Sequence, residues 1–417
     1  MFFALAVAAM VQTGVVESVI VHGNHTTPTA DVLAIAGDLA GREATDALFA
    51  EVTARLVQSG RFAGVDVRRR LLSLDDDSRV LVVIVVDEHE GISDEDLTPG
   101  PLKRFRAGGM WLPVLDYQEG YGFTYGARVS FVDRLGPRSR ISVPLTWGGG
   151  RQAGLEVERA FAGGRLSRVV GGAEVTRREH PFYEVGDTRR GIWGRVETAP
   201  RAWLRGGAGA RRARVSFGDV DDTLVTSGVD VTLDTRRDPA LPRNAVYASA
   251  GIERLAFDAR SLAVGGATGP RAAGRLSLDV RGYLGLIGQA VLAVRAQSVT
   301  ASRRLPEYEQ QMLGGAASLR GHDVGSQVGD NLAAVSVEVL APLTSPLTLA
   351  HAGLKVFVDR GAVYAAGERL ADRRLEWGYG AGWFLNATVF SLGIDIGWRE
   401  GRSTPNAHVQ LGVRLTR

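Results

Sequence analysis

The sequence lacks cysteine altogether and contains very little lysine. Its 417 residues include no Cys, which excludes disulfides and thiolate metal sites. Lys occurs only at positions 103 and 355, so nearly all of the positive charge is carried by Arg. The net charge of +3 is too small to favour a nucleic-acid partner, and we expect none.

Long apolar runs are also absent. No run approaches the ~20 residues that a transmembrane helix needs. The longest, residues 2–11, opens the chain and resembles the apolar region of a secretory signal, with Ala6-Val7-Ala8 as a cleavage site, although no basic segment precedes it. We therefore expect residues 1–14 to be a signal-like segment. A buried first strand is the alternative.

Residues 15–91 have the pattern of a small α+β domain. Leu48, Val52 and Leu56 recur every four residues and form the apolar stripe of a helix that Gly60 ends. Thr29 or Asp31 is expected to cap a shorter helix before it. The expected order is strand, helix, helix, strand, strand, over residues 18–21, 29–37, 44–58, 62–71 and 78–87.

Helical periodicity disappears after residues 92–108, an acidic linker that contains proline. In residues 391–398 apolar side chains alternate with Ser, Gly and Asp, and the same split recurs in residues 140–147, 275–284 and 408–415. Strict alternation predicts strands that have one apolar face and one polar face.

A soluble sandwich and a membrane barrel would both show this alternation. The segments are about 10 residues or longer, whereas strands of globular proteins most often have about 5–6. A tilted strand that crosses the hydrocarbon core needs about 9–11 residues, and a water-filled lumen accepts the mixture of small and charged residues on the polar face. Closure leaves no strand edge unpaired in lipid. We therefore expect residues 109–417 to form an antiparallel transmembrane β-barrel.

The alternation predicts sixteen strands in this barrel. An even number is usual for bacterial barrels. Long connections at residues 179–188, 258–270 and 302–330 fall on one side, whereas residues 236–244 form the one long connection on the other, periplasmic side. The expected strands begin near residues 109, 122, 139, 152, 167, 190, 203, 225, 244, 272, 289, 331, 348, 374, 387 and 406.

Three short motifs lie at defined places in this pattern. The first, Leu319-Arg320-Gly321-His322, lies in a Gly-rich connection between the eleventh and twelfth strands. A connection as long as this one is usually functional or disordered. The other two are Asp234-Thr235-Arg236-Arg237-Asp238-Pro239, followed by Pro242, and Phe357-Val358-Asp359-Arg360-Gly361.

A single small domain followed by sixteen strands and these motifs resembles the outer-membrane assembly-factor superfamily of BamA and TamA, which includes two-partner secretion transporters. The motifs are similar to that family's Val-Arg-Gly-Phe loop, its Asp-x-Arg-Asp…Pro turn and its Phe-x-Asp-x-Gly strand. The resemblance implies that residues 15–91 are a POTRA domain. His322 departs from the family's aromatic, and residues 413–417 do not end on the aromatic usual for such barrels.

Strand alternation indicates which groups Arg320 could reach. Val335 and Val337 belong to an apolar face, so Glu338 points into the lumen, and the same argument places Asp359 in the lumen from the next strand. A guanidinium can bind carboxylates in a planar, bidentate way. The resemblance implies that Arg320 is held by these two residues. The alternative is an exposed loop above solvated lumen charges.

The sequence gives no sign of an enzyme or a cofactor. The seven His residues lack catalytic motifs and metal-binding spacing, so we expect no catalytic residue and no metal site. We expect His180, alone in a connection, to be solvated.

The resemblance implies a role in outer-membrane protein assembly, with the POTRA-like domain in the periplasm. That domain would bind unfolded chains by β-augmentation. The barrel would insert or pass these chains at the seam between its first and last strands. The implied partners are unfolded outer-membrane or secreted polypeptides, outer-membrane lipid, and periplasmic or lipoprotein accessory subunits. A two-partner secretion transporter and a passive pore or anchor are the alternatives.

Overall fold

The computed structural model describes residues 14–72, 78–93, 96–100, 103, 107, 109–258, 272–347, 350–387 and 390–413. The chain divides into two compact units, Met1–Gly109 and Met110–Arg417. Most of the signal-like segment, the junction at residues 75–77, parts of the linker, nearly all of the 258–270 connection and the end of the chain lie outside the described residues.

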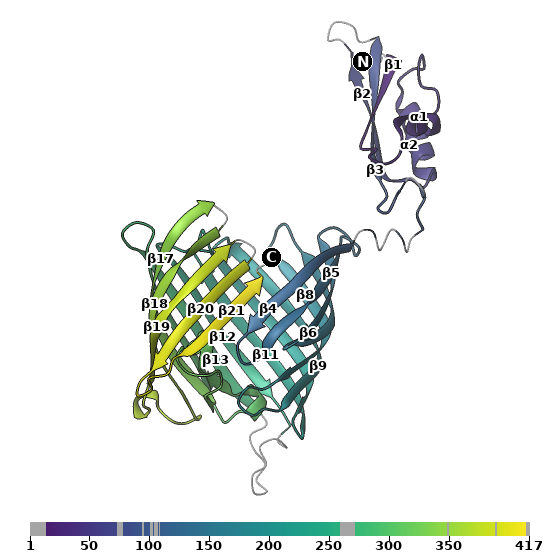
Figure 1. Cartoon of the computed structure of the whole chain (residues 1–417). Coiled ribbons are helices and arrows are strands. Elements are labelled where there is room, and N and C mark those ends of the chain that lie inside the picture. Colours follow the sequence, from purple (N-terminus) through teal and green to yellow (C-terminus); the bar gives the residue numbers. More distant parts are fainter. Residues whose placement is uncertain are drawn as a thin grey trace, which may run out of the picture. The chain divides into compact units, whose positions relative to one another are not determined.

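The N-terminal unit is a three-stranded sheet with two helices. Its strands have the order β1 (Val15–His22), β3 (Arg79–Glu88), β2 (Phe62–Leu71), with β1 parallel and β2 antiparallel to β3. The helices are α1 (Thr29–Ala36) and α2 (Asp46–Gln58). The predicted element order is thus present (Figure 1).

Alternate residues of β3 and one face of α2 form the core of this unit. Leu48, Val52 and Leu56 are buried with Val82 and Ile84, as the four-residue spacing predicts. The Thr45 hydroxyl accepts a hydrogen bond from the Leu48 N–H and caps α2.

The ends of two elements differ from the prediction. Helix α1 follows Pro28 and has no side-chain cap, so the expectation that Thr29 or Asp31 caps it is wrong. Strand β1 begins at Val15 rather than Ser18, because Val16 is buried in the core and the Val15 N–H donates to the Ser78 carbonyl. Among the described residues, no helix is long and apolar enough to cross a membrane.

The second unit is a closed barrel of sixteen antiparallel strands, which confirms the predicted number (Figure 1). We call the end that carries the 302–330 connection the loop end, and the end that carries the 235–244 connection the turn end. The wall strands are β4 (Gly109–Gln118), β5 (Gly122–Val132), β6 (Ser139–Gly148), β7 (Arg151–Ala160), β8 (Arg168–Glu179), β9 (Gly186–Arg201), β10 (Leu204–Phe217), β11 (Val220–Asp234), β12 (Ala245–Ala256), β13 (Ala272–Gly285), β14 (Val291–Ala301), β17 (Asn331–Leu347), β18 (Ala350–Tyr364), β19 (Glu376–Ala387), β20 (Phe390–Arg399) and β21 (Asn406–Val413).

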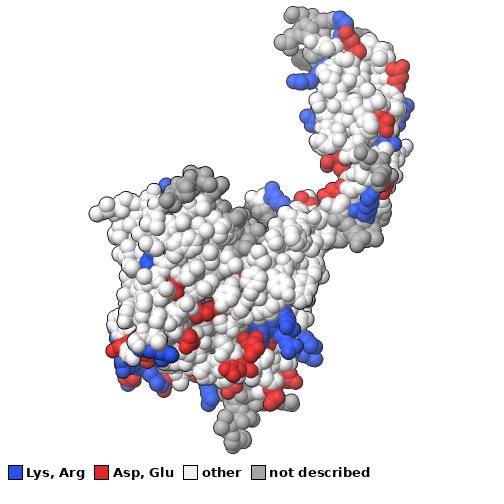
Figure 2. Space-filling view, viewed as in Figure 1, with Lys and Arg blue, Asp and Glu red and all other residues white. Residues whose placement is uncertain are grey.

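The outward face of the wall is apolar. Ile192, Val229 and Ile252 each expose more than half of their surface on it. Figure 2 shows few charged side chains over most of the viewed wall, and Lys, Arg, Asp and Glu gather toward its lower end. The expected connection at residues 179–188 is shorter in the structure, because β9 already begins at Gly186.

The barrel closes where its last strand meets its first. At this junction Leu411 pairs with Tyr117 and Gly412 with Asp116. Elsewhere in the wall, β10 and β11 are paired from Leu204 to Phe217. We call the β4–β21 junction the seam.

Candidate functional site: a loop inside the barrel

Residues 302–330, which we call the inner loop, fold back into the barrel from its loop end. The loop contains a short hairpin of β15 (Gln311–Leu313) and β16 (Gln327–Gly329), with the single-turn helix α4 (Gly315–Ser318) between them. The 3-10 helix η2 (Glu307–Glu309) precedes the hairpin.

The base of the inner loop is fixed to the wall by ion pairs. The Glu309 carboxylate accepts hydrogen bonds from Arg189 and Arg275, each at 2.8 Å. The Tyr308 hydroxyl donates to Asp222 at 2.6 Å. No local pattern in the sequence marks Glu309, because its partners lie on strands β9 and β13, far away along the chain.

Gly321 allows the loop backbone to pass close to the wall. Its φ of 88° lies in the left-handed region, which favours glycine. A Cβ on Gly321 would lie 2.5 Å from the Trp398 carbonyl oxygen. The motif therefore needs glycine after Arg320 for two reasons, conformation and space.

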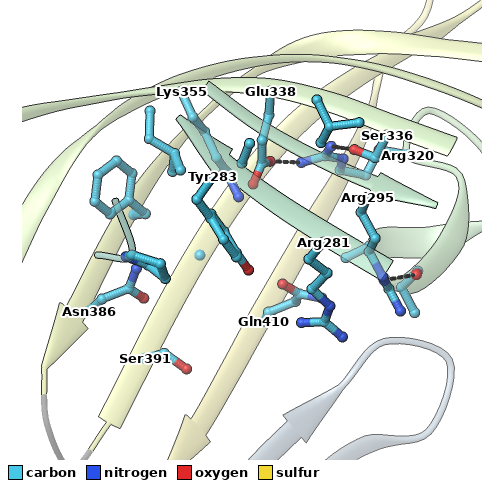
Figure 3. Close-up of a pocket in the computed structure, with 18 of the residues that line it drawn as sticks. Arg281, Tyr283, Arg295, Arg320, Ser336, Glu338, Lys355, Asn386, Ser391 and Gln410 are labelled. Carbon is cyan, nitrogen blue, oxygen red and sulfur yellow. Dashed lines mark hydrogen bonds and ion pairs between the residues drawn. The ribbon is translucent and has the colours of Figure 1, made fainter. Parts of the chain in front are cut away.

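The Arg320 side chain points into the lumen and binds two carboxylates on neighbouring strands. Figure 3 shows its contact with one of them, Glu338. Its Nε and Nη2 donate to the two oxygens of Asp359 at 2.8 and 2.7 Å. Its Nη1 donates to Glu338 Oε2 at 3.0 Å, and Nη2 also donates to Ser336 Oγ at 2.9 Å. The guanidinium lies 3.6 Å from the ring centroid of Phe357. Arg320 is thus held in position and in orientation.

A third carboxylate, that of Asp395 on β20, completes this group. Its Oδ2 lies 3.4 Å from Arg320 Nη1 and 3.0 Å from Lys355 Nζ. We call Arg320, Ser336, Glu338, Asp359 and Asp395 the Arg320 cluster. Alternation in the sequence places Asp395 on the inward face of β20, but no sequence spacing links it to Arg320.

Burial makes the Arg320 cluster energetically important. The side chains of Arg320, Asp359 and Asp395 expose 7%, 2% and 3% of their surface. Removing one partner of a buried ion pair typically costs about 3–5 kcal/mol, because the other charge remains buried without compensation.

His322 occupies a buried site next to the cluster. It exposes 5% of its surface, and its Nε2 lies 3.0 Å from the Trp377 carbonyl oxygen. The imidazole thus packs as a ring, as an aromatic would, and adds a hydrogen bond to strand β19.

The turn motif lies at the opposite end of the barrel. Arg236 Nε and Nη2 donate to the two oxygens of Asp234 at 2.8 and 2.9 Å. The Arg236 guanidinium also stacks on the Tyr247 ring, 4.6 Å from its centroid. Asp238 Oδ1 accepts the Ala240 N–H at 2.8 Å, and Asp238 Oδ2 lies 3.3 Å from His351 Nε2.

These contacts direct the 235–244 connection into the lumen. Leu241 is buried against Phe384, Val291 and Leu340, all on wall strands. The Asn386 side chain donates to the Ala240 carbonyl at 3.0 Å. The sequence motif did not reveal this inward fold.

A cavity of about 450 Å³ lies between the two inward-folded segments. Residues 316–318 and Arg320 of the inner loop line one side of it, and residues 239–242 of the turn line another. Figure 3 shows Arg281, Arg295 and Lys355 around the same space. Arg281 and Arg295 share Asp279, and Lys355 pairs with Asp395, so each of these cations has a carboxylate partner on the wall.

His180 is buried, and our expectation that it is solvated is wrong. It exposes 4% of its surface and lies against Tyr183 and Phe217, with ring centroids at 5.0 and 5.5 Å. Burial, together with the charge of Arg178, holds the pKa of His180 below its ordinary value. Among the described residues, no group of three or more His, Asp or Glu side chains could hold a metal ion.

Comparisons with known proteins identify relatives of the barrel. A family model described as the Omp85 superfamily domain matches residues 123–414. No curated protein matches the chain. The fold is similar to the crystal structure of BamA from Haemophilus ducreyi lacking POTRA domains 1-3, with 13% sequence identity and a TM-score of 0.62 over 95% of this chain and 84% of that chain.

A second similar structure is CdiB from Escherichia coli. It is 14% identical in sequence, with a TM-score of 0.51 over 96% of this chain and 76% of that chain. At such low identities the two structures show a shared fold.

Proposed function

The chain belongs to the Omp85 superfamily of outer-membrane β-barrel proteins, and we propose that it inserts polypeptides into the outer membrane at the seam between β4 and β21. The observation that carries this proposal is the seam itself. There the last strand of the wall meets the first, with Leu411 paired to Tyr117 and Gly412 to Asp116, so an incoming strand could pair with β21 in place of β4 without crossing the rest of the wall.

We also propose that the N-terminal unit is a periplasmic POTRA domain. The order β-α-α-β-β and the sheet order β1-β3-β2 support this assignment. Among the described residues, the start of β1 is already hydrogen-bonded to residues 41–44 on its outer edge, whereas the outer edge of β2 has no recorded strand partner. Such an edge can bind an extended chain by β-augmentation, which would bring unfolded polypeptides to the barrel.

The Arg320 cluster would hold the inner loop in place while the barrel inserts a polypeptide. An inner loop fixed to β17, β18 and β20 supports the wall beside the seam strand β21. It also obstructs the lumen together with the 235–244 connection. Both features argue against a permanently open pore. No catalytic role is assigned to any residue, and we expect no enzymatic activity.

The decisive experiment is reconstitution into lipid vesicles, followed by addition of an unfolded outer-membrane barrel whose folding is timed. We expect faster folding with the full chain, and loss of the acceleration when residues 17–90 are deleted. Vesicles with the deleted chain also control for lipid defects.

Other outcomes would support the alternatives. No acceleration, together with a large and steady conductance, would indicate a passive pore. No acceleration and little conductance would indicate secretion of a dedicated partner.

A further inference from the structure

Beyond the Arg320 cluster, a second set of hydrogen bonds joins the inner loop to the seam. The Gly321 N–H donates to His408 Nε2 at 2.7 Å, and His408 Nδ1 lies 2.7 Å from Glu119 Oε1. The other oxygen of Glu119 accepts the Ala316 N–H at 3.1 Å. We call Glu119, His408 and these two N–H groups the relay.

The hydrogen bonds define the state of the imidazole. Because Nε2 accepts the Gly321 N–H, the ring proton is on Nδ1 and is donated to Glu119. The His408 side chain is fully buried, and both of its nitrogens are used. Losing either bond leaves a buried polar group without a partner, which costs about 1–3 kcal/mol.

The relay lies where the backbone pairing of the seam has ended. The last recorded pair toward the loop end is Leu411 with Tyr117. Glu119 follows β4 directly, and His408 precedes Leu411 on β21. Side chains bound to the inner loop therefore join the two seam strands beyond their last backbone pair.

The relay also adjoins the Arg320 cluster. Gly321 is the next residue after Arg320, and Asp395 is the cross-strand partner of His408 on β20. The Asn406 side chain, also on β21, adds donations to the Gly321 carbonyl and to Asp323, both at 3.2 Å. A displacement of Arg320 would thus act directly on the relay bond of Gly321.

We propose that Glu119 and His408 are positioning residues that fasten the inner loop to both strands of the seam, so that the loop and the loop end of the seam are released together. The proposal deepens the proposed function, because it identifies what holds the seam closed before a strand enters. It concerns a structural coupling, so it can be tested without any insertion assay.

Two substitutions at position 408 can remove the two hydrogen bonds of His408 one at a time. In His408→Asn the amide takes the place of Nδ1 and can keep Glu119, whereas in His408→Gln it takes the place of Nε2 and can keep Gly321. Each loses one half of the relay. Gln410→Asn is the matched control, since Gln410 lies on the same inward face of β21 and lines the cavity.

The measurement is amide hydrogen exchange of the full chain in lipid, followed by mass spectrometry. We expect exchange of residues 314–323 and of residues 406–413 to become about tenfold faster in both His408 variants, as loss of one buried hydrogen bond would predict. The Gln410→Asn protein should exchange like the wild type. Faster exchange in one segment alone, or an equal effect of Gln410→Asn, would overturn the proposal.

Arg320→Lys provides the reciprocal test, because it changes the cluster and leaves the relay residues intact. Coupling requires that this substitution also accelerates exchange of residues 406–413. A purely local role of His408 would leave that segment unchanged. If the His408 variants do not fold, Glu119→Gln replaces them. This substitution retains the size of the side chain and loses one acceptor oxygen. Faster exchange of both segments would support the proposal, and faster exchange of one segment alone would overturn it. If the exchange experiments show the coupling but the protein does not accelerate folding of substrate barrels, the proposed function is contradicted and the coupling of loop and seam is not.

Discussion

At the scale of single residues, the site combines a charge that needs partners with glycines that leave room for it. Arg320 is surrounded by carboxylates from three strands, and its backbone lies against the wall at Gly378. A Cβ on Gly378 would lie 1.8 Å from the Arg320 carbonyl oxygen. The charge and the space around it can be tested separately.

Replacement of Arg320 by Ala should destabilise the barrel. It leaves Asp359 buried without its cation and Asp395 with Lys355 alone, and the expected cost is about 3–5 kcal/mol. The midpoint of heat unfolding, followed by the gel shift of the folded barrel, measures it. Arg369→Ala is the control, because that side chain is 87% exposed. Unchanged heat resistance and unchanged substrate folding in the Arg320 variant would contradict a role in the barrel.

Gly378→Ala should displace the inner loop without removing any charge. The added methyl group meets backbone oxygen, which cannot rotate away. Gly393→Ala is a matched control on the neighbouring strand, since its Cβ would meet nothing closer than the Lys355 ammonium at 3.8 Å. We expect faster protease cleavage within residues 302–330 in the Gly378 variant only. Equal cleavage of the two variants would show that the close approach has no consequence.

At the scale of elements, two connections behave as parts of the lumen rather than as surface loops. The inner loop binds the wall through ions and hydrogen bonds, whereas the 235–244 connection is held by Leu241 in an apolar cluster. Both narrow the barrel around one cavity. The N-terminal unit contains its own partly buried hydrogen bonds, which join the Glu88 carboxylate to the turn before α1.

Leu241→Ala should open the turn end of the barrel. Truncation of a buried Leu side chain typically lowers the free energy of unfolding by about 2–5 kcal/mol, and here it removes the packing of Leu241 against Phe384. We expect larger single-channel conductance in planar bilayers, with the inner loop still in place. Leu343→Ala, at a residue that is 65% exposed on β17, is the control. A conductance equal to that of the wild type would show that the turn does not obstruct the lumen.

The N-terminal unit should lose stability in acid through Glu88. Partial burial alone would raise the pKa of this carboxyl, but hydrogen bonds from Thr27 and Thr26 outweigh it and lower the pKa below its usual value. The unfolded chain therefore binds the proton more readily. The stabilisation is present above the unfolded pKa of about 4.3 and is lost as the pH falls through the lower folded value.

Hydrogen exchange of residues 14–92 in the full chain, measured from pH 6 downward by pulse labelling, checks this dependence. Glu88→Gln should remove part of the change with pH, whereas Glu43→Gln, at an exposed residue of the same unit, should retain it. An identical pH response of wild type and Glu88→Gln would exclude Glu88 as its source.

At the scale of the whole molecule, the barrel is a closed wall in which the last strand, β21, pairs with the first, β4. The chain contains no cysteine, so introduced pairs can be crosslinked without a background. Tyr117→Cys with Leu411→Cys joins the seam, and Ala208→Cys with Val229→Cys joins β10 to β11 in the same way.

A short thiol crosslinker at the seam should abolish acceleration of substrate folding. The same crosslinker between β10 and β11 should leave it intact, because that junction already pairs along its full length. Vesicle folding assays with and without a reductant measure both. Full activity with a crosslinked seam would contradict insertion at this junction.

Much of this architecture could be predicted from local sequence pattern. Alternation with a period of two determines which face of a strand is apolar, so it yielded the sixteen strands and the inward direction of Glu338 and Asp359. The four-residue spacing of Leu48, Val52 and Leu56 likewise specified α2 and its buried face. Boundaries were less certain, as at β1 and β9, because the end of a strand depends on its partners.

What only the tertiary structure decided is which distant residues meet. Alternation gives the inward face of Asp395 and His408, but nothing in the sequence links them or Glu119 to the inner loop, because closure of the barrel brings β4, β20 and β21 together around a loop that lies far from them in sequence. Burial of His180 and Leu241 has the same origin, since connections fold inward only when a closed wall offers partners. Sequence periodicity indicates which side chains of a strand face the lumen. Contacts across the lumen depend instead on the curvature that closes the sixteen strands into a barrel.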